Sequence, residues 1–255
     1  MDFRSSLKPA LLALSVTSAS IASQTLQADT FFGVYVGAGF WQNQYSGTFT
    51  EGGSPIDVES NLNFEDENNN FVYAAIEHPI PLIPNVRLSQ TEIENTANTS
   101  LNQSITFVDT TYNINASISS VVDLTFSDVT FYYELLDNWI SLDLGLAARN
   151  FDGTLSITES AVTESVELNA TVPLLYAATK AELPFTGFYI SGSLVGIGLD
   201  DNSVTDLSVN LGYESDYGIG AELGYRSINI DIQEIDELAT DLDVDGLYLA
   251  ATFHF

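Results

Sequence analysis

Apolar and polar residues alternate with a period of two through most of this chain. In the final ten residues, one parity is entirely apolar, comprising Leu247, Leu249, Ala251, Phe253 and Phe255. The other parity is small, polar or amphipathic, comprising Gly246, Tyr248, Ala250, Thr252 and His254. Because side chains alternate between the two faces of a strand, this pattern predicts a strand with one face suited to lipid and the other to a lumen. The same alternation recurs in residues 140–149, 204–214 and 219–226.

Turn signals divide the chain into ten strand-length segments. They lie at about 32–49, 71–78, 86–94, 121–135, 139–151, 168–182, 187–199, 204–214, 218–230 and 242–255. Tight connections follow the even-numbered segments, and longer, acidic loops are expected at 50–70, 152–167 and 231–241. We therefore predict an all-β, antiparallel up-and-down transmembrane barrel with ten strands, and eight strands with one large external hairpin as the alternative. Outer-membrane barrels place short turns in the periplasm and long loops outside, so both termini are expected in the periplasm.

Residues 1–28 have the features of a secretory signal peptide. Arg4 and Lys8 form a basic start, residues 9–22 form a short apolar core, and cleavage is expected after Ala28 or, as an alternative, after Ala22. A disordered tail is the other interpretation of this segment. The barrel is then expected to occupy residues 29–255. No run of eighteen apolar residues occurs, which excludes a helical membrane protein.

An exported β-sandwich would show the same alternation. The polar faces of the predicted strands are rich in Gly, Ala and Ser, with occasional charges, and this composition suits a narrow interior better than a water-facing surface. The barrel is therefore favoured.

The charge balance is strongly acidic. The chain has 6 Lys and Arg against 35 Asp and Glu, and residues 1–28 hold two of these cations and one of these acids, so residues 29–255 carry a net charge of −30. A nucleic-acid partner is excluded because phosphate binding needs a basic surface. The acids need water, so acidic extracellular loops are expected.

Residues 241–246 (DLDVDG) match the start of an EF-hand calcium loop. Position twelve, however, would be Thr252, and no helices flank the segment. We predict no cofactor and no defined metal site, with at most weak binding of divalent cations at the loops.

The four cations after residue 28 all fall on the polar faces of predicted strands. A cation facing lipid at mid-bilayer would cost about 2–4 kcal/mol, so these side chains are expected in the lumen. They are Arg87, Arg149, Lys180 and Arg226, with Glu77, Glu134, Asp143, Glu182 and Glu222 as expected partners. The main interpretation is an ion-pair network that fills and plugs the barrel. The alternative is a charged constriction in a narrow pore for small, cation-preferring solutes.

An enzyme is not predicted. Enzymatic outer-membrane barrels would use histidine with serine or aspartate near the outer rim, and the only two histidines here, His78 and His254, lie at expected periplasmic strand ends. No catalytic residue is proposed from the sequence.

Several segments together resemble a family of small, uncharacterised outer-membrane β-barrel proteins of Gram-negative bacteria. They are residues 33–41 (GVYVGAGFW), 77–85 (EHPIPLIPN), 132–139 (YYELLDNW), 151–153 (FDG) and 252–255 (TFHF). The resemblance covers nearly all of residues 29–255 and implies insertion into the outer membrane, in contact with its lipid and lipopolysaccharide. It also implies assembly through the barrel-assembly machinery, which would recognise the strand end at Phe253 and Phe255. It implies no activity, so a structural or surface-interaction role is expected.

Overall fold

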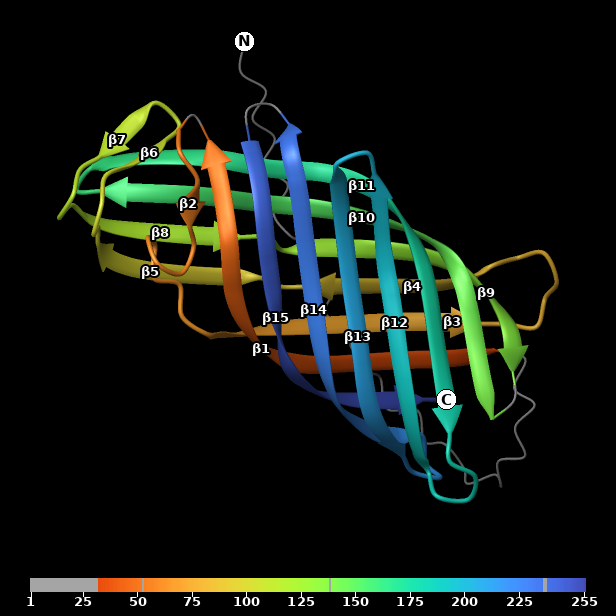
Figure 1. Ribbon diagram of the computed structural model, residues 1–255. Coiled ribbons are helices and arrows are strands. Elements are labelled where there is room, and N and C mark those ends of the chain that lie inside the picture. The colour runs from red at the N-terminus through yellow and green to blue at the C-terminus, as the bar shows by residue number, and fades with distance from the viewer. Residues whose placement is uncertain (1–31, 52, 138, 236–237) are drawn as a thin grey trace, which may run out of the picture. The chain divides into compact units, whose positions relative to one another are not determined.

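The computed structural model describes residues 32–51, 53–137, 139–235 and 238–255, which form strands and connecting turns (Figure 1). The predicted signal peptide, residues 1–28, lies outside the described residues. The strands are β1 (Gly33–Glu51), β2 (Ile56–Asp57), β3 (Glu67–Glu77), β4 (Asn85–Thr91), β5 (Glu94–Ser100), β6 (Ile105–Phe107), β7 (Thr110–Tyr112), β8 (Ser117–Asp123), β9 (Phe126–Asp137), β10 (Ile140–Glu159), β11 (Val162–Glu182), β12 (Phe188–Leu199), β13 (Asn202–Glu214), β14 (Ile219–Ile235) and β15 (Leu238–His254). Within this part of the chain, no helix is long and apolar enough to cross a membrane.

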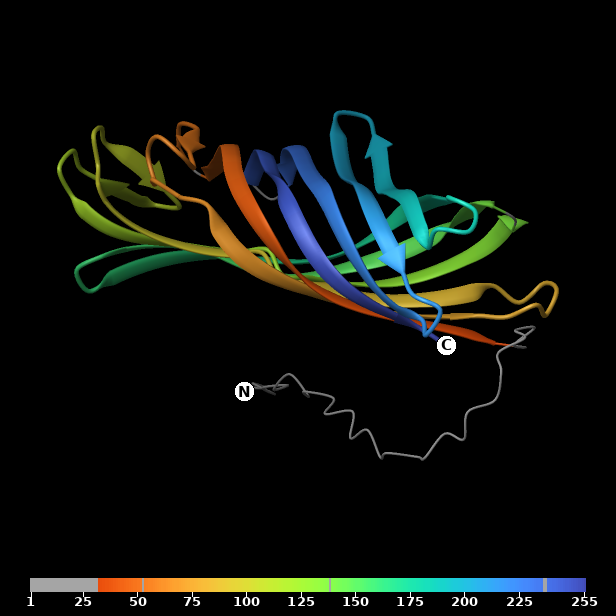
Figure 2. The same ribbon diagram turned by 90° about the horizontal axis from the view of Figure 1, so that it is seen from below.

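Ten of these strands form a closed antiparallel barrel. Their order around the barrel is β1-β3-β4-β9-β10-β11-β12-β13-β14-β15, and β15 pairs with β1 to close it. The predicted up-and-down barrel of ten strands is therefore confirmed, and the eight-strand alternative is wrong. Both views show the wall of cyan and blue strands, β12 to β15, crossing the opposite wall of green strands, β9 to β11 (Figures 1 and 2).

The two ends of the barrel differ. At one end, called here the turn end, short connections join β3 to β4, β9 to β10, β11 to β12 and β13 to β14, and these strands stop together. At the other end, called the extension end, several strands run far on, and β5 and β8 continue the lines of β4 and β9 (Figure 1). The small β6–β7 hairpin follows β5 and precedes β8 in the chain.

The long loops predicted at 152–167 and 231–241 are wrong, because most of these residues are strand. β10 and β11 stay paired out to Glu159 and Val162, and β14 and β15 stay paired out to Ile235 and Leu238. Many of the polar residues that indicated loops, such as Asp152, Thr154 and Asp241, lie on the outward faces of these strands.

A belt of exposed apolar side chains surrounds the barrel. Each of the ten strands contributes at least one large outward residue to it, and examples in barrel order are Phe40, Val72, Leu88, Val129, Leu146, Leu175, Leu194, Leu207, Leu223 and Leu249. Cross-strand neighbours such as Phe40 and Leu249, or Leu194 and Leu207, make the belt continuous. A continuous outward apolar band is the surface that a lipid bilayer covers in transmembrane barrels.

Beyond the belt, toward the extension end, the polarity of both faces reverses. On β15 the outward positions change from Leu247 to Asp245 and Asp243, while the inward positions change from Tyr248 to the buried Val244. On β14 the outward face likewise becomes polar while the inward face acquires isoleucines, at residues 228 and 230. The extension, meaning the strand segments beyond the belt, therefore has the polar surface and apolar interior of a water-soluble β-structure.

Candidate functional site

The lumen is the candidate functional site, and it has three layers along its axis. A cavity of about 310 Å³ opens toward the turn end, a buried ion cluster lies above it, and an apolar plug fills the extension. All nine charged residues expected in the lumen line this cavity: Glu77, Arg87, Glu134, Asp143, Arg149, Lys180, Glu182, Glu222 and Arg226.

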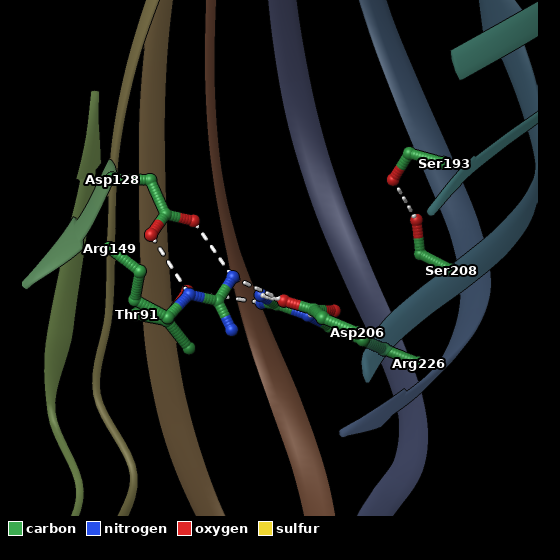
Figure 3. Close-up of polar contacts among 7 residues, drawn as sticks. All are labelled: Thr91, Asp128, Arg149, Ser193, Asp206, Ser208 and Arg226. Carbon is green, nitrogen blue, oxygen red and sulfur yellow. Dashed lines mark hydrogen bonds and ion pairs between the residues drawn. The ribbon is translucent and has the colours of Figure 1, made fainter. Parts of the chain in front are cut away.

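The ion cluster centres on Arg149, whose side chain is 0% exposed. Its Nε and Nη2 donate to the two carboxylate oxygens of Asp128 at 2.9 and 2.8 Å, and Nη2 also meets Asp206 Oδ2 at 2.7 Å (Figure 3). Arg226 also donates to the carboxylate of Asp206, through Nε at 2.9 Å and Nη2 at 2.7 Å. Forked, charge-assisted bonds of this kind are stronger and more directional than neutral ones.

This cluster ties opposite walls of the barrel together. Asp128 and Arg149 lie directly opposite each other on β9 and β10, whereas Asp206 and Arg226 come from β13 and β14. Arg226 Nη1 also donates to Thr91 Oγ1 on β4 at 3.1 Å (Figure 3). The cluster is therefore a side-chain bridge that spans the lumen between these walls.

The apolar plug begins directly beyond the cluster. Trp41 is fully buried beneath Arg226, whose guanidinium carbon lies 5.2 Å from the centroid of the indole ring. The remaining plug side chains come from strand interiors, from β6 and β7, and from the segment between β1 and β3. They include Tyr45, Phe49, Ile56, Val58, Leu62, Phe64, Ile93, Phe107, Tyr112, Phe126 and Ile157. Together they form a continuous cluster of buried apolar side chains.

Asp57 stabilises a turn in the segment between β1 and β3. Its Oδ1 accepts the backbone N–H groups of Ser60 at 2.7 Å and Glu59 at 3.1 Å. The bond from the Ser60 backbone is the main reason that the pKa of Asp57 lies below its usual value.

In the cavity, tyrosines and carboxylates pair along the wall. Tyr132 Oη donates to Glu77 Oε1, and Tyr189 Oη donates to Glu222 Oε1, each at 2.7 Å. At the turn end, Lys180 Nζ meets Glu182 at 2.9 Å in a more exposed pair.

The arginine partners differ from those expected. Arg149 and Arg226 bind Asp128 and Asp206, neither of which was among the five predicted carboxylates, and Arg87 packs 3.8 Å from the centroid of the Tyr73 ring. Asp206 lies on the polar parity of its strand, so the sequence carried a signal for it. Asp128 shares the parity of Glu134 on its strand, so the sequence carried a signal for it as well, but its pairing opposite Arg149 depends on the register set by a β-bulge at Leu142/Asp143.

The remaining predicted positions lie at the turn end or on the outer face. Phe253 and Phe255 are exposed, and His254 Nδ1 lies 3.3 Å from Glu214 Oε1 while its ring stacks on Tyr35. Asp243 and Asp245 accept hydrogen bonds from Asn229 and Tyr225 on the neighbouring strand. Across the described residues, no group of three or more histidine or acidic side chains is arranged to hold a metal ion.

Comparison with known proteins places the fold. The outer membrane protease OmpT from Escherichia coli superposes with a TM-score of 0.53 and 9% identity, over 91% of this chain and 99% of that one. The Ail protein of Yersinia pestis matches at a TM-score of 0.38 with 13% identity over 89% and 100% of the two chains, and the NalP translocator domain of Neisseria meningitidis at 0.44 with 13% identity over 88% of each. No family model and no curated protein matches the sequence. The chain has the fold of Gram-negative outer-membrane β-barrel proteins.

Proposed function

We propose that this chain is an integral outer-membrane barrel with a closed lumen, which acts through its extension outside the cell. The observation that carries the proposal is the reversal of polarity beyond the apolar belt. An apolar interior and an acidic exterior are stable only in water, so the extension stands out of the bilayer. The short connections at the other end then face the periplasm, as do residues 33 and 255.

The closed lumen argues against the alternative role as a narrow pore. Seven carboxylates and four cations line the cavity, which would favour small cations there. A solute moving outward from the cavity would then have to break the Arg149–Asp206–Arg226 bridge and open a packed apolar layer. A cavity that opens only toward the periplasm does not let ions or solutes cross the barrel.

A non-enzymatic role is part of this proposal. OmpT is a protease, but its 9% identity transfers only the fold. The chain has two histidines, and both lie at the turn end, far along the barrel from the extension. General acid–base catalysis at the cell surface would therefore have to do without histidine.

Contact of the belt with outer-membrane lipid and lipopolysaccharide belongs to the same proposal, as does recognition of Phe253 and Phe255 by the assembly machinery. Phe253 is exposed near the end of the last strand, and Phe255, directly after that strand, is exposed as well.

Proteoliposomes test the closed lumen. Vesicles holding the refolded protein should release entrapped potassium no faster than protein-free vesicles. A matched variant in which a Gly–Ser linker of equal length replaces residues 54–65 removes Ile56, Val58, Leu62 and Phe64 from the plug, and it should release potassium faster. Rapid release from the unaltered protein would refute the closed lumen.

Cysteine labelling tests the orientation, since the chain contains no cysteine. In intact cells, a membrane-impermeant maleimide should label Asn169→Cys, in the extension, and leave Tyr217→Cys, at the turn end, unlabelled until the outer membrane is broken. The reverse pattern would invert the proposed orientation.

A further inference from the structure

The extension leaves one long strand edge without a partner. Beyond the belt, β11 pairs with β10 alone, because its pairing with β12 begins only at Leu175 and Gly196. In Figure 1, β11, β10, β8 and β5 follow one another in this part of the sheet, with β11 at its margin. An unpaired edge presents a row of backbone donors and acceptors to which another strand can add.

The direction of those backbone groups follows from two hydrogen bonds. Glu182 N–H donates to Trp139 O, so even-numbered residues of β11 point toward β10. Asp152 N–H donates to Thr125 O, away from β11, so its cross-strand partner Asn169 points away from β10 as well. The β10–β11 register runs without a shift, so this alternation holds along the whole hairpin. The free N–H groups are those of Thr163, Ser165, Glu167, Asn169 and Thr171.

The opposite edge of the same sheet is capped. Asn69 binds both backbone groups of Glu94 on β5, accepting from its N–H at 2.9 Å and donating to its carbonyl at 3.1 Å. Asn95 Nδ2 donates to Glu65 O at 2.6 Å. On β11, the Glu164 carboxylate accepts a hydrogen bond from Thr110 on β7 at 2.8 Å. Within the described part of the chain, no side chain binds the free backbone N–H groups between residues 163 and 171. The contrast leaves the β11 edge as the open one.

The side chains along this edge define what would fit. Val166, Leu168 and Val172 face inward and are only partly buried against the plug. An added strand would complete their burial if every second residue of it were apolar. On the outward face, Glu167 and the nearby Asp152 are exposed.

The acidic outer surface of the extension favours cationic side chains on the outward face of an added strand. All four cations after residue 28 line the lumen cavity, so the outer surface of the extension carries acids without cations. Outward lysines or arginines on the incoming strand would meet this field favourably. A second copy of this chain lacks such outward cations and fits poorly.

We propose that the β11 edge, residues 163–171, binds an extended segment of a partner protein that alternates apolar residues with lysine or arginine. The segment adds as a strand beside β11, with its apolar side chains toward Val166, Leu168 and Val172. This inference deepens the proposed surface role and rests on it.

The probe is a synthetic nine-residue peptide of alternating valine and lysine, added to the full refolded barrel in detergent micelles. Fluorescence anisotropy gives its affinity, and amide hydrogen exchange locates its site. We expect slowed exchange at residues 163–171, and binding about tenfold weaker when alternate peptide amides are N-methylated. Equal binding of the N-methylated peptide, absence of binding, or protection confined to another strand would overturn the proposal.

Three variants make the test more specific. Asn169→Pro removes one free N–H without touching the β10 ladder and should weaken binding about fivefold or more, whereas Asn169→Ala should not. Glu167→Lys keeps every backbone group and should weaken the lysine peptide while improving a valine–glutamate peptide. Unchanged affinities in these variants would place the peptide elsewhere. Potassium release from vesicles would refute the closed lumen independently, so the two failures are distinguishable.

Discussion

Arg149→Met removes the centre of the ion cluster. Asp206 keeps its forked bond to Arg226, but Asp128 loses both of its bonds at a site where its side chain is 7% exposed. Breaking a buried pair by removing one partner typically costs about 3–5 kcal/mol, because it leaves an uncompensated buried charge. We therefore expect Arg149→Met to lower the free energy of unfolding by about this amount.

Adding Asp128→Asn should recover roughly half of that loss, because it removes the unpaired buried carboxylate. Lys180→Met is the control, since it breaks the exposed pair with Glu182 and should cost less than about 1 kcal/mol. The assay is urea unfolding of the four proteins in lipid vesicles, followed by tryptophan fluorescence. A loss for Arg149→Met no larger than that of Lys180→Met, or a double variant that shows no recovery, would refute the role assigned to the cluster.

Three further predictions test the belt, the plug segment and the plug itself. Leu207→Arg in the belt should cost about 2–4 kcal/mol of stability in vesicles, while Thr205→Arg on the same face beyond the belt should cost less than about 1 kcal/mol; equal losses would contradict the belt. The pKa of Asp57 is lower in the folded protein than in the unfolded chain, where it is about 4. Its carboxylate therefore stabilises the segment between β1 and β3 above about pH 4, and this stabilisation is lost as the pH falls through the lower folded pKa. Asp57→Asn should therefore remove an acid-induced rise in amide exchange at residues 57–64, and identical acid profiles would contradict this. In the Trp139→Phe variant, Trp41 is the sole tryptophan and should resist acrylamide quenching; ready quenching would contradict a packed plug.

The sequence predicts the membrane-spanning half of this fold well, because local alternation is enough there. Leu247, Leu249 and Phe253 point outward and Tyr248 and Ala250 inward, as their parity indicates. Period-two alternation is a property of neighbouring residues, so it survives without knowledge of the tertiary structure.

The extension was missed for a physical reason. On β10, Asn150, Asp152 and Thr154 continue the alternation with Leu155 and Ile157, but with the polar set outward and the apolar set inward. Polar content alone indicated a loop, and only the position of the belt tells which face meets water. The sequence could have revealed the strand through the buried parity of residues 155 and 157.

The cluster and the open edge depend on tertiary structure. Asp128 faces Arg149 because of a bulge six to seven residues away on β10, and Asp206 arrives from the opposite wall. The unpaired stretch of β11 exists because β12 ends at Leu199 and turns into β13 at residues 200–201, so it does not reach the first part of β11. No short-range pattern encodes either arrangement.

Single-channel recording in planar bilayers tests the closed lumen most directly. With insertion verified by protease protection, the unaltered protein should give a silent membrane in potassium chloride at both voltage polarities. Under the same conditions, the variant with residues 54–65 replaced should produce current steps. Stable, stepwise conductance by the unaltered protein would contradict a barrel closed by the Arg149 cluster and the apolar plug.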